Sequence, residues 1–393
     1  MPERAVPTPK PYAGRVIFAV KLTVSIALLV YMLIRADAGA VWSKITGADT
    51  LPLFLACLTP FVGYWLISLR WKRLLTAARV RVRQRPLYRA SMIAMFYNQL
   101  LPSTVGGDVA RGIEAHRAGV PKATALSSLV VDRIIGIVAL AVLAAITLPL
   151  VDDYPGRPML LYVVVWGAAL MMLAAIATIF SPHESMLSVG RAVYRRLPRP
   201  FARAAKKIDD SVDGYRGRPG VFAAAFVSSV VLQLNVVLMH WLIASALAIE
   251  INFVTLVLVV PLALIVMLAP VTINGIGIRE GIFTVLLAAY GVSETQAVAM
   301  ALLVYAVFLL HGILGGMVVL GGTIHRRNRA AADGPAARPE PAGRHAGGTP
   351  HAAVVTPDER PVHRDASSTP RPAAQAPAQT ASAGTPRSPS DTP

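Results

Sequence analysis

The sequence predicts an all-α polytopic membrane protein with about six full transmembrane helices and two re-entrant hairpins, or eight spans by simple hydropathy counting. Hydrophobic residues make up 55% of the 393 residues and charged residues only 15%, whereas the apolar share of soluble proteins, glycine included, is roughly 45–50%. Long apolar runs recur along the chain. The Lys and Arg residues that give the formal charge of +17 cluster between those runs, which is the positive-inside pattern of membrane proteins.

This charge pattern favours membrane topology and contact with anionic lipids over nucleic-acid binding. The single cysteine, Cys57, lies in an apolar run, so neither an intrachain disulfide nor a cysteine-rich metal site is expected. The sequence contains no HExxH, P-loop or nucleophile-elbow motif. We therefore predict no enzyme activity, no cofactor and no metal, and the sequence does not indicate any protein partner.

Seven apolar segments approach the roughly 20 residues needed to cross the hydrocarbon core. They are residues 16–34, 51–69, 124–150, 158–180, 220–248, 250–270 and 297–320. The first segment follows a basic N-terminus and could be a signal peptide, because Ala36-Asp37-Ala38 offers small residues for cleavage. Its length and Lys21 favour a retained anchor instead.

The links between segments set the orientation. The link from Arg70 to Arg89 holds eight Lys and Arg residues and no acid, whereas the links near Asp37 and at Asp152-Asp153 hold acids and few bases. This asymmetry places the N-terminus, residues 1–15, and the Arg70 link in the cytoplasm. A second basic link, residues 181–219, is predicted to be either an amphipathic interfacial helix or a solvated loop.

The membrane domain is predicted to span residues 16–324. After His325 the chain turns to Ala, Pro, Gly, Ser and Thr, a composition that predicts a disordered cytoplasmic tail over residues 325–393. With both ends in the cytoplasm the number of crossings must be even, yet the apolar segments number seven. At least one segment is therefore expected not to cross.

An internal repeat resolves this parity problem. The stretches NQLLPSTVGGDVARG, from Asn98, and APVTINGIGIREG, from Ala269, share the pattern P-x-T-x-x-G-x-x-x-R, and each precedes a long apolar helix. The helix after the first stretch is predicted to run outward and the helix after the second inward. The repeats, at about residues 87–150 and 250–320, are therefore inverted, an arrangement found in many secondary transporters.

Each repeat is predicted to contribute one re-entrant hairpin, over residues 87–117 from the cytoplasm and 250–290 from outside. Proline and glycine suit the chain reversals at the tips. The tip residues are Pro102, Gly106, Gly107, Pro270, Gly275 and Gly277. Non-helical backbone at membrane depth implies a watery cavity beside it. Shallow interfacial loops between ordinary spans are the alternative.

Ionisable residues within these segments are functional candidates, because charges in the membrane must pair or face water. We predict that three arginines, Arg111, Arg133 and Arg279, converge on a lipid phosphate, which suits the guanidinium fork. The supporting residues are predicted to be Asp108, Asp132 and Glu280, which hold the arginines in the empty site, and Asn98 and Asn274, which cap freed backbone. A purely structural ion-pair network is the alternative. For Gln233, Asn235, His240 and His311, interhelical hydrogen bonds are expected.

Four motifs carry a family resemblance: NQLLPSTVGGDVARG, VVDRIIGIVAL, NGIGIREG and YGVSETQAVAMALL. In this order, over roughly residues 17–319, the chain resembles the transmembrane domain of bacterial lysylphosphatidylglycerol synthases, which also occurs alone in uncharacterised prokaryotic membrane proteins. The resemblance implies an integral membrane protein of the flippase type. The low-complexity residues after His325 are too few for the aminoacyltransferase domain of the full synthases, so synthase activity is not expected.

Three functions remain open at this point. The leading hypothesis is a transporter that moves an anionic phospholipid or lipid-linked precursor between leaflets. The alternatives are a membrane-embedded transferase that acts on a lipid headgroup, with Asp108 or Glu280 as general base, and a non-transporting accessory subunit of an envelope-lipid pathway.

Overall fold

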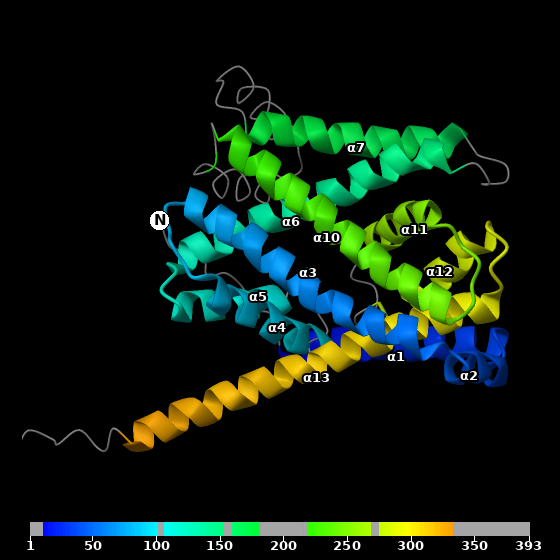
Figure 1. The fold of residues 1–393 in the computed structure, drawn as a ribbon, viewed down its shortest axis with the longest axis horizontal. Coiled ribbons are helices and arrows are strands. Elements are labelled where there is room, and N and C mark those ends of the chain that lie inside the picture. The colour runs from blue at the N-terminus through cyan, green and yellow to red at the C-terminus, as the bar shows by residue number, and fades with distance from the viewer. Residues whose placement is uncertain are drawn as a thin grey trace, which may run out of the picture. The chain divides into compact units, whose positions relative to one another are not determined.

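The computed structural model describes residues 11–100, 106–151, 159–180, 215, 218–268 and 275–332. This part of the chain is helical throughout, which confirms the all-α class for it (Figure 1). The elements are α1 (Pro11–Arg35), α2 (Ala38–Thr46), α3 (Thr50–Ala77), α4 (Gln84–Leu100), α5 (Gly106–Arg117), α6 (Lys122–Thr147), the 3₁₀ turn η1 (Leu148–Leu150), α7 (Met159–Phe180), α10 (Pro219–Ala246), α11 (Phe253–Val266), α12 (Ile278–Ala288) and α13 (Glu294–Ala332). The basic link 181–219 lies largely, and the predicted tail beyond residue 332 entirely, outside the described residues.

Four described stretches are long and apolar enough to cross a membrane: α3, α6 with η1, α10, and α13 as far as Thr323. A fifth span results if α1 and α2, which meet at an 85° bend, are taken together. Shorter apolar stretches lie at 162–174 in α7 and along α11. The described residues thus support a multi-pass membrane protein, while the six crossings and the inverted repeat stay predictions.

Helix α3 runs further than its apolar segment predicted. Residues 70–77 continue the helix, so the link between helices begins only after Ala77, and its cytoplasmic side stays a prediction. The physical reason is packing: Trp71, Leu74 and Leu75 are buried, and their i, i+3, i+4 spacing extends one face of α3 against its neighbours. The basic residues of this stretch therefore belong to a packed helix. Likewise α13 continues past the predicted boundary at residue 325, through a run of arginine and alanine with high helix propensity.

Short polar side chains begin three of the helices. The Asp37 carboxylate accepts hydrogen bonds from the backbone amides of the first turn of α2, which the sequence analysis did not predict. Asp49 caps α3 and Asn252 caps α11 in the same way. These side chains satisfy amide groups that have no partner within the helix. The acids interpreted above as marks of an outer link thus also have a local structural role.

The two Gly-rich stretches each join a pair of helices. In the first, α4 packs against α5, and Asn98 Oδ1 accepts a hydrogen bond from Gly107 N at 2.9 Å. A Cβ on Gly107 would lie 2.7 Å from the carbonyl oxygen of Ala94, so this close approach requires glycine. In the second, which joins α11 to α12, Gly275 and Gly277 have φ of 77° and 83°. Of the predicted tip residues, Pro102 and Pro270 lie outside the described residues, as does Asn274.

The helices pack in pairs that are distant in sequence. Helix α3 runs along α10, α4 along α13, and α6 against α11 (Figure 1). The largest apolar core lies among α10, α11, α12 and α13, where Ile243, Leu256, Leu287 and Met300 are fully buried. Helix α3 also contacts α4 and α6, and α5 contacts the same two helices. Arg70, Arg111 and Asp132 are buried in this part of the structure.

Candidate functional site: an arginine and aspartate chain between the helices

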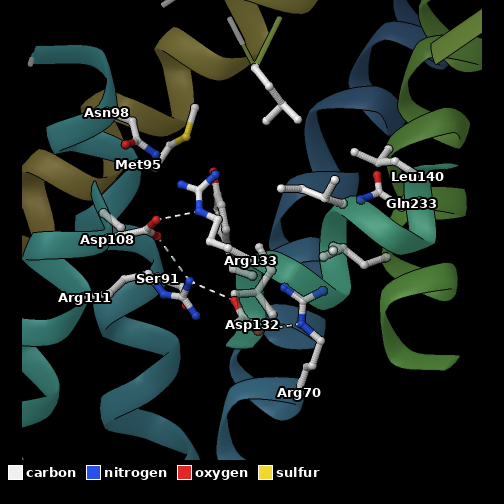
Figure 2. Close-up of a pocket in the computed structure, with 17 residues that line it drawn as sticks. Arg70, Ser91, Met95, Asn98, Asp108, Arg111, Asp132, Arg133, Leu140 and Gln233 are labelled. Carbon is white, nitrogen blue, oxygen red and sulfur yellow. Dashed lines mark hydrogen bonds and ion pairs between the residues drawn. The ribbon is translucent and has the colours of Figure 1, made fainter. Parts of the chain in front are cut away.

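A cavity of about 270 Å³ lies among α3, α4, α5, α6 and α10. Its floor is charged and its walls are mostly apolar (Figure 2). The charged side chains that line it are Arg70, Asp108, Arg111, Asp132 and Arg133, and the neutral polar ones include Tyr64, Ser91, Asn98 and Gln233. Four consecutive helices and the more distant α10 thus bring polar residues to one pocket.

The charged residues form a continuous chain of ion pairs (Figure 2). Asp132 lies at its centre: its Oδ1 accepts a hydrogen bond from Arg70 Nε at 2.6 Å and its Oδ2 from Arg111 Nη1 at 3.3 Å. Arg111 Nη1 is also 3.5 Å from Asp108 Oδ1, and Arg133 Nε donates to Asp108 Oδ2 at 2.6 Å. The order of the chain is therefore Arg70, Asp132, Arg111, Asp108, Arg133, which we call the arginine–aspartate chain.

Helical spacing explains this order. Asp108 and Arg111 are three residues apart on α5 and therefore share one face. Asp132 and Arg133 are adjacent on α6 and point in different directions, so each reaches a partner on another helix. Two residues on α5, two on α6 and one on α3 are thus enough to link these three helices.

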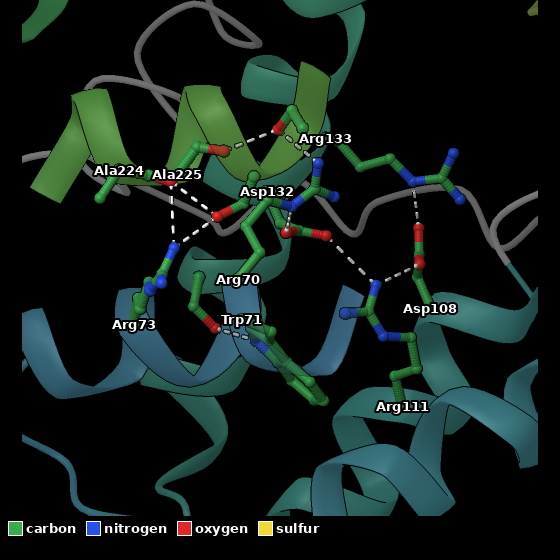
Figure 3. Close-up of polar contacts among 12 residues, drawn as sticks. Arg70, Trp71, Arg73, Asp108, Arg111, Asp132, Arg133, Ala224 and Ala225 are labelled. Atoms are coloured by element: carbon green, nitrogen blue, oxygen red, sulfur yellow. Dashed lines mark hydrogen bonds and ion pairs between the residues drawn. The ribbon is translucent and has the colours of Figure 1, made fainter. Parts of the chain in front are cut away.

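Further polar contacts hold the buried end of the arginine–aspartate chain, at Arg70, in place (Figure 3). Arg70 Nη1 donates to Ser229 Oγ at 2.6 Å, which ties α3 to α10. Trp71 Nε1 donates to Ser128 Oγ at 2.9 Å, which ties α3 to α6. Arg73 donates to Ser228 Oγ at 2.5 Å. Such acceptors stabilise a buried arginine like Arg70, because an unpaired buried donor is costly.

Exposure rises along the arginine–aspartate chain. The side chains of Arg70 and Asp132 are almost completely buried, at 7% and 3% exposed, while Arg133 at the other end is 45% exposed. Arg111, in between, is 8% exposed. The arginine–aspartate chain contains three arginines and two aspartates, so it carries one net positive charge. The site is therefore a positively charged pocket whose polar floor extends from solvent-accessible Arg133 to the buried centre.

Arg111 has donors that the protein does not use. Its Nε and Nη2 atoms are buried and have no hydrogen-bond partner in the described structure. Its guanidinium carbon lies 4.5 Å from the centroid of the Trp71 ring, so the group is held in place by stacking and by its Nη1 contacts. Nε and a terminal nitrogen are the kind of donor pair that binds a carboxylate or phosphate with two parallel hydrogen bonds. A buried unsatisfied pair of this kind calls for an explanation.

The predicted site residues of the second repeat lie elsewhere. Arg279, at the start of α12, is buried with its guanidinium over the rings of Tyr305 and Phe308, and it does not line the pocket. Glu280 Oε2 accepts a hydrogen bond from Gly277 N at 2.6 Å and so caps its own helix. The convergence of Arg111, Arg133 and Arg279 on one phosphate stays a prediction, and only Arg111 and Arg133 line the same pocket.

Sequence reasoning missed Arg70, which it counted as a cytoplasmic link residue. The available signal was helical spacing: Tyr64, Ile67 and Arg70 follow one another at three-residue intervals, and all three line the pocket. Among the described residues, no group of three or more His, Cys, Asp or Glu side chains is arranged to hold a metal ion. The two buried histidines, His240 and His311, each place Nδ1 within 3 Å of the carbonyl oxygen four residues before them.

Comparison with known proteins shows the family to which the chain belongs. The family model of the lysylphosphatidylglycerol synthase TM region matches residues 18–316. A UPF0104 membrane protein of Pyrococcus horikoshii is 22% identical over 319 residues, which cover 76% of this chain and 95% of the relative. A UPF0104 membrane protein of Methanothermobacter thermautotrophicus is 21% identical over 301 residues, covering 72% and 88%. The chain is therefore a multi-pass membrane protein that belongs to the family of the lysylphosphatidylglycerol synthase transmembrane region.

Proposed function

We propose that the protein is a lipid transporter that moves an anionic phospholipid or a lipid-linked precursor between the leaflets of a prokaryotic cytoplasmic membrane. The arginine–aspartate chain is the phosphate site in this proposal. The observation that carries it is Arg111, which lines a positively charged cavity and whose Nε and Nη2 atoms are buried without a hydrogen-bond partner in the described structure. Two oxygens of one phosphate would accept hydrogen bonds from both donors at once, which would explain why both donors are unpaired in the empty site.

The two aspartates fit a site that must bind a phosphate and also release it. In the empty site, Asp132 and Asp108 neutralise Arg111 through contacts of 3.3 and 3.5 Å, both longer than the 2.6 Å contacts to Arg70 and Arg133. Arg111 is therefore the arginine that the aspartates hold most loosely. A site that conducts must bind its ligand firmly enough for entry and weakly enough for exit, and competing carboxylates supply that balance.

The arrangement supports transport over headgroup transfer. Of the two candidate general bases, Asp108 has both carboxylate oxygens near arginines, and Glu280 accepts a hydrogen bond from the backbone of its own helix. Both carboxylates thus already have partners within the protein, and neither is free to act as a general base. In this proposal, both termini of the chain lie in the cytoplasm and the α4–α5 pair forms the cytoplasmic hairpin that presents Arg111.

A reconstitution assay tests this function. Purified full-length protein is placed in phosphatidylcholine liposomes that contain a trace of phosphatidylglycerol with a fluorescent acyl chain, and a membrane-impermeant reductant then quenches the outer leaflet. Transport exposes inner-leaflet lipid to the reductant, so quenching should exceed the plateau of protein-free liposomes. Mass spectrometry of the recovered lipid separates the rivals, because a transferase would change the headgroup.

The Arg111→Gln variant supplies the link to the site. It should bring quenching back to the protein-free plateau. Arg117→Gln is the matched control, since Arg117 also lies on α5 but is exposed and pairs with Glu114 away from the pocket. A quenching plateau for the unmodified protein equal to that of empty liposomes would refute the transporter proposal and leave the accessory-subunit function.

A further inference from the structure

The charges of the pocket bear on the headgroup of the lipid as well as on its phosphate. Only two acidic side chains, Asp108 and Asp132, are among the described residues that line it, and each one already contacts two arginines. Asp132 is also almost fully buried. A positively charged headgroup entering this pocket would find arginines nearby and no carboxylate that is not already paired.

We infer that the pocket takes a phosphodiester lipid whose headgroup is uncharged and carries hydroxyl groups, and that it discriminates against headgroups that carry amines. This inference rests on the proposed function, because it specifies the ligand of the same site. It also separates this chain from the lipid in its family's name, since a lysyl headgroup carries amino groups that are cationic at neutral pH.

The first argument is electrostatic. The nearest ammonium group of an aminoacylated headgroup is several bonds from the phosphate, so it would lie within roughly 10 Å of the guanidinium groups once the phosphate is bound at Arg111, a distance at which like charges still repel in a partly buried site. Repulsion between like charges falls off slowly in a partly buried site, where the effective dielectric constant is far below that of water. An ammonium that approached Asp108 would have to compete with the contacts this carboxylate already makes with Arg111 and Arg133. A cationic headgroup should therefore bind less tightly than an uncharged one in either position.

The second argument is the neutral polar lining. Ser91, Asn98 and Gln233 carry hydroxyl and amide groups that suit hydrogen bonds with alcohols. Asn98 uses Oδ1 to accept from Gly107 N, which leaves the Nδ2 amine as a donor. The cavity of about 270 Å³ lies just below the roughly 300–1,000 Å³ of pockets for whole drug-sized ligands. It suits a phosphate with a small headgroup.

Equilibrium binding tests the inference. The full-length protein is reconstituted in nanodiscs of phosphatidylcholine, and fluorescent short-chain phosphatidylglycerol is titrated in, then displaced with unlabelled phosphatidylglycerol or lysylphosphatidylglycerol. The phosphatidylglycerol affinity should exceed the lysylphosphatidylglycerol affinity by about tenfold or more, the scale of one unit charge repelled across roughly 10 Å in a partly buried site. Equal affinities, or tighter binding of the lysyl lipid, would overturn the inference.

A charge variant shows whether the pocket causes the preference. Arg133→Gln removes one positive charge at the more exposed end of the arginine–aspartate chain and should reduce the discrimination several-fold. Arg117→Gln removes the same charge from an exposed position on α5 and should leave the discrimination unchanged. If both variants reduce it equally, the preference comes from general surface charge and the inference is wrong.

The outcomes also separate this inference from the proposed function. If transport in liposomes occurs and depends on Arg111, while both lipids bind equally well, the inference fails and the transporter proposal stands. If neither lipid binds the protein and no lipid is transported, both fail together.

Discussion

Replacing Asp132 with asparagine should destabilise the protein more than any other conservative change in the pocket. The side chain is 3% exposed and accepts hydrogen bonds from two arginines that are themselves buried. Asparagine keeps the shape but removes the charge, so Arg70 and Arg111 would share a buried site without a full counter-charge. Breaking a buried ion pair by removing one partner costs about 3–5 kcal/mol. Two charge-assisted hydrogen bonds of about 1.5–3 kcal/mol each give a similar total.

Thermal unfolding in detergent, followed by intrinsic fluorescence or a thiol-reactive dye, measures this loss. At about 2 °C per kcal/mol, the lower end of the scale for domains of this size, the melting temperature should fall by roughly 6–10 °C. Asp49→Asn is the matched control, because Asp49 caps α3 and asparagine caps a helix equally well. Its melting temperature should stay close to that of the unmodified protein.

A double variant checks the physical reason. Adding Arg70→Met to Asp132→Asn removes one of the two stranded arginines, so the combined loss should be smaller than the sum of the single losses. Two results would refute the reasoning: an Asp132→Asn protein as stable as the Asp49→Asn control, or losses that simply add.

Three further predictions concern packing, the site and topology. Gly107→Ala should cost about 1–3 kcal/mol of stability by forcing α4 away from α5, whereas Gly167→Ala, which meets open space, should cost nothing measurable in the same thermal assay. Arg111→Lys should weaken phosphatidylglycerol binding while Arg279→Lys leaves it unchanged, because of these two arginines only Arg111 lines the pocket, and two single losses that combine non-additively in the double variant would show that both contact one phosphate. A reporter fused after His325 should give a cytoplasmic signal, and an external signal would contradict the inverted repeat.

Much of the helical architecture could be predicted from hydropathy alone. Runs of about 20 apolar residues find α3, α6, α10 and α13, because a helix must be apolar over that length to cross the membrane. Hydropathy could not find α2, a nine-residue helix that begins at the cap Asp37 after an 85° bend. Its signal is local capping chemistry, which is easily confused with the acidic residues of an outer loop.

The candidate site could be predicted only in part. The rule that charges within the membrane need partners drew attention to Asp108, Arg111, Asp132 and Arg133, and the structure brings these four to one pocket. It gave no information about which helices pack together, since that depends on contacts between distant segments. Arg70 was missed for a related reason: counting link arginines assumes that they are solvated, and burial against Asp132 overrides that assumption.

The most direct test of the phosphate site is the affinity of the Arg111→Lys protein for phosphatidylglycerol in nanodiscs. Lysine keeps the positive charge but lacks the planar donor pair that Nε and Nη2 form. The site as proposed predicts a loss of about 1–3 kcal/mol in binding, or roughly 5–150-fold in Kd, with Arg117→Lys unchanged. An Arg111→Lys protein that is folded and binds phosphatidylglycerol as tightly as the unmodified protein would contradict it.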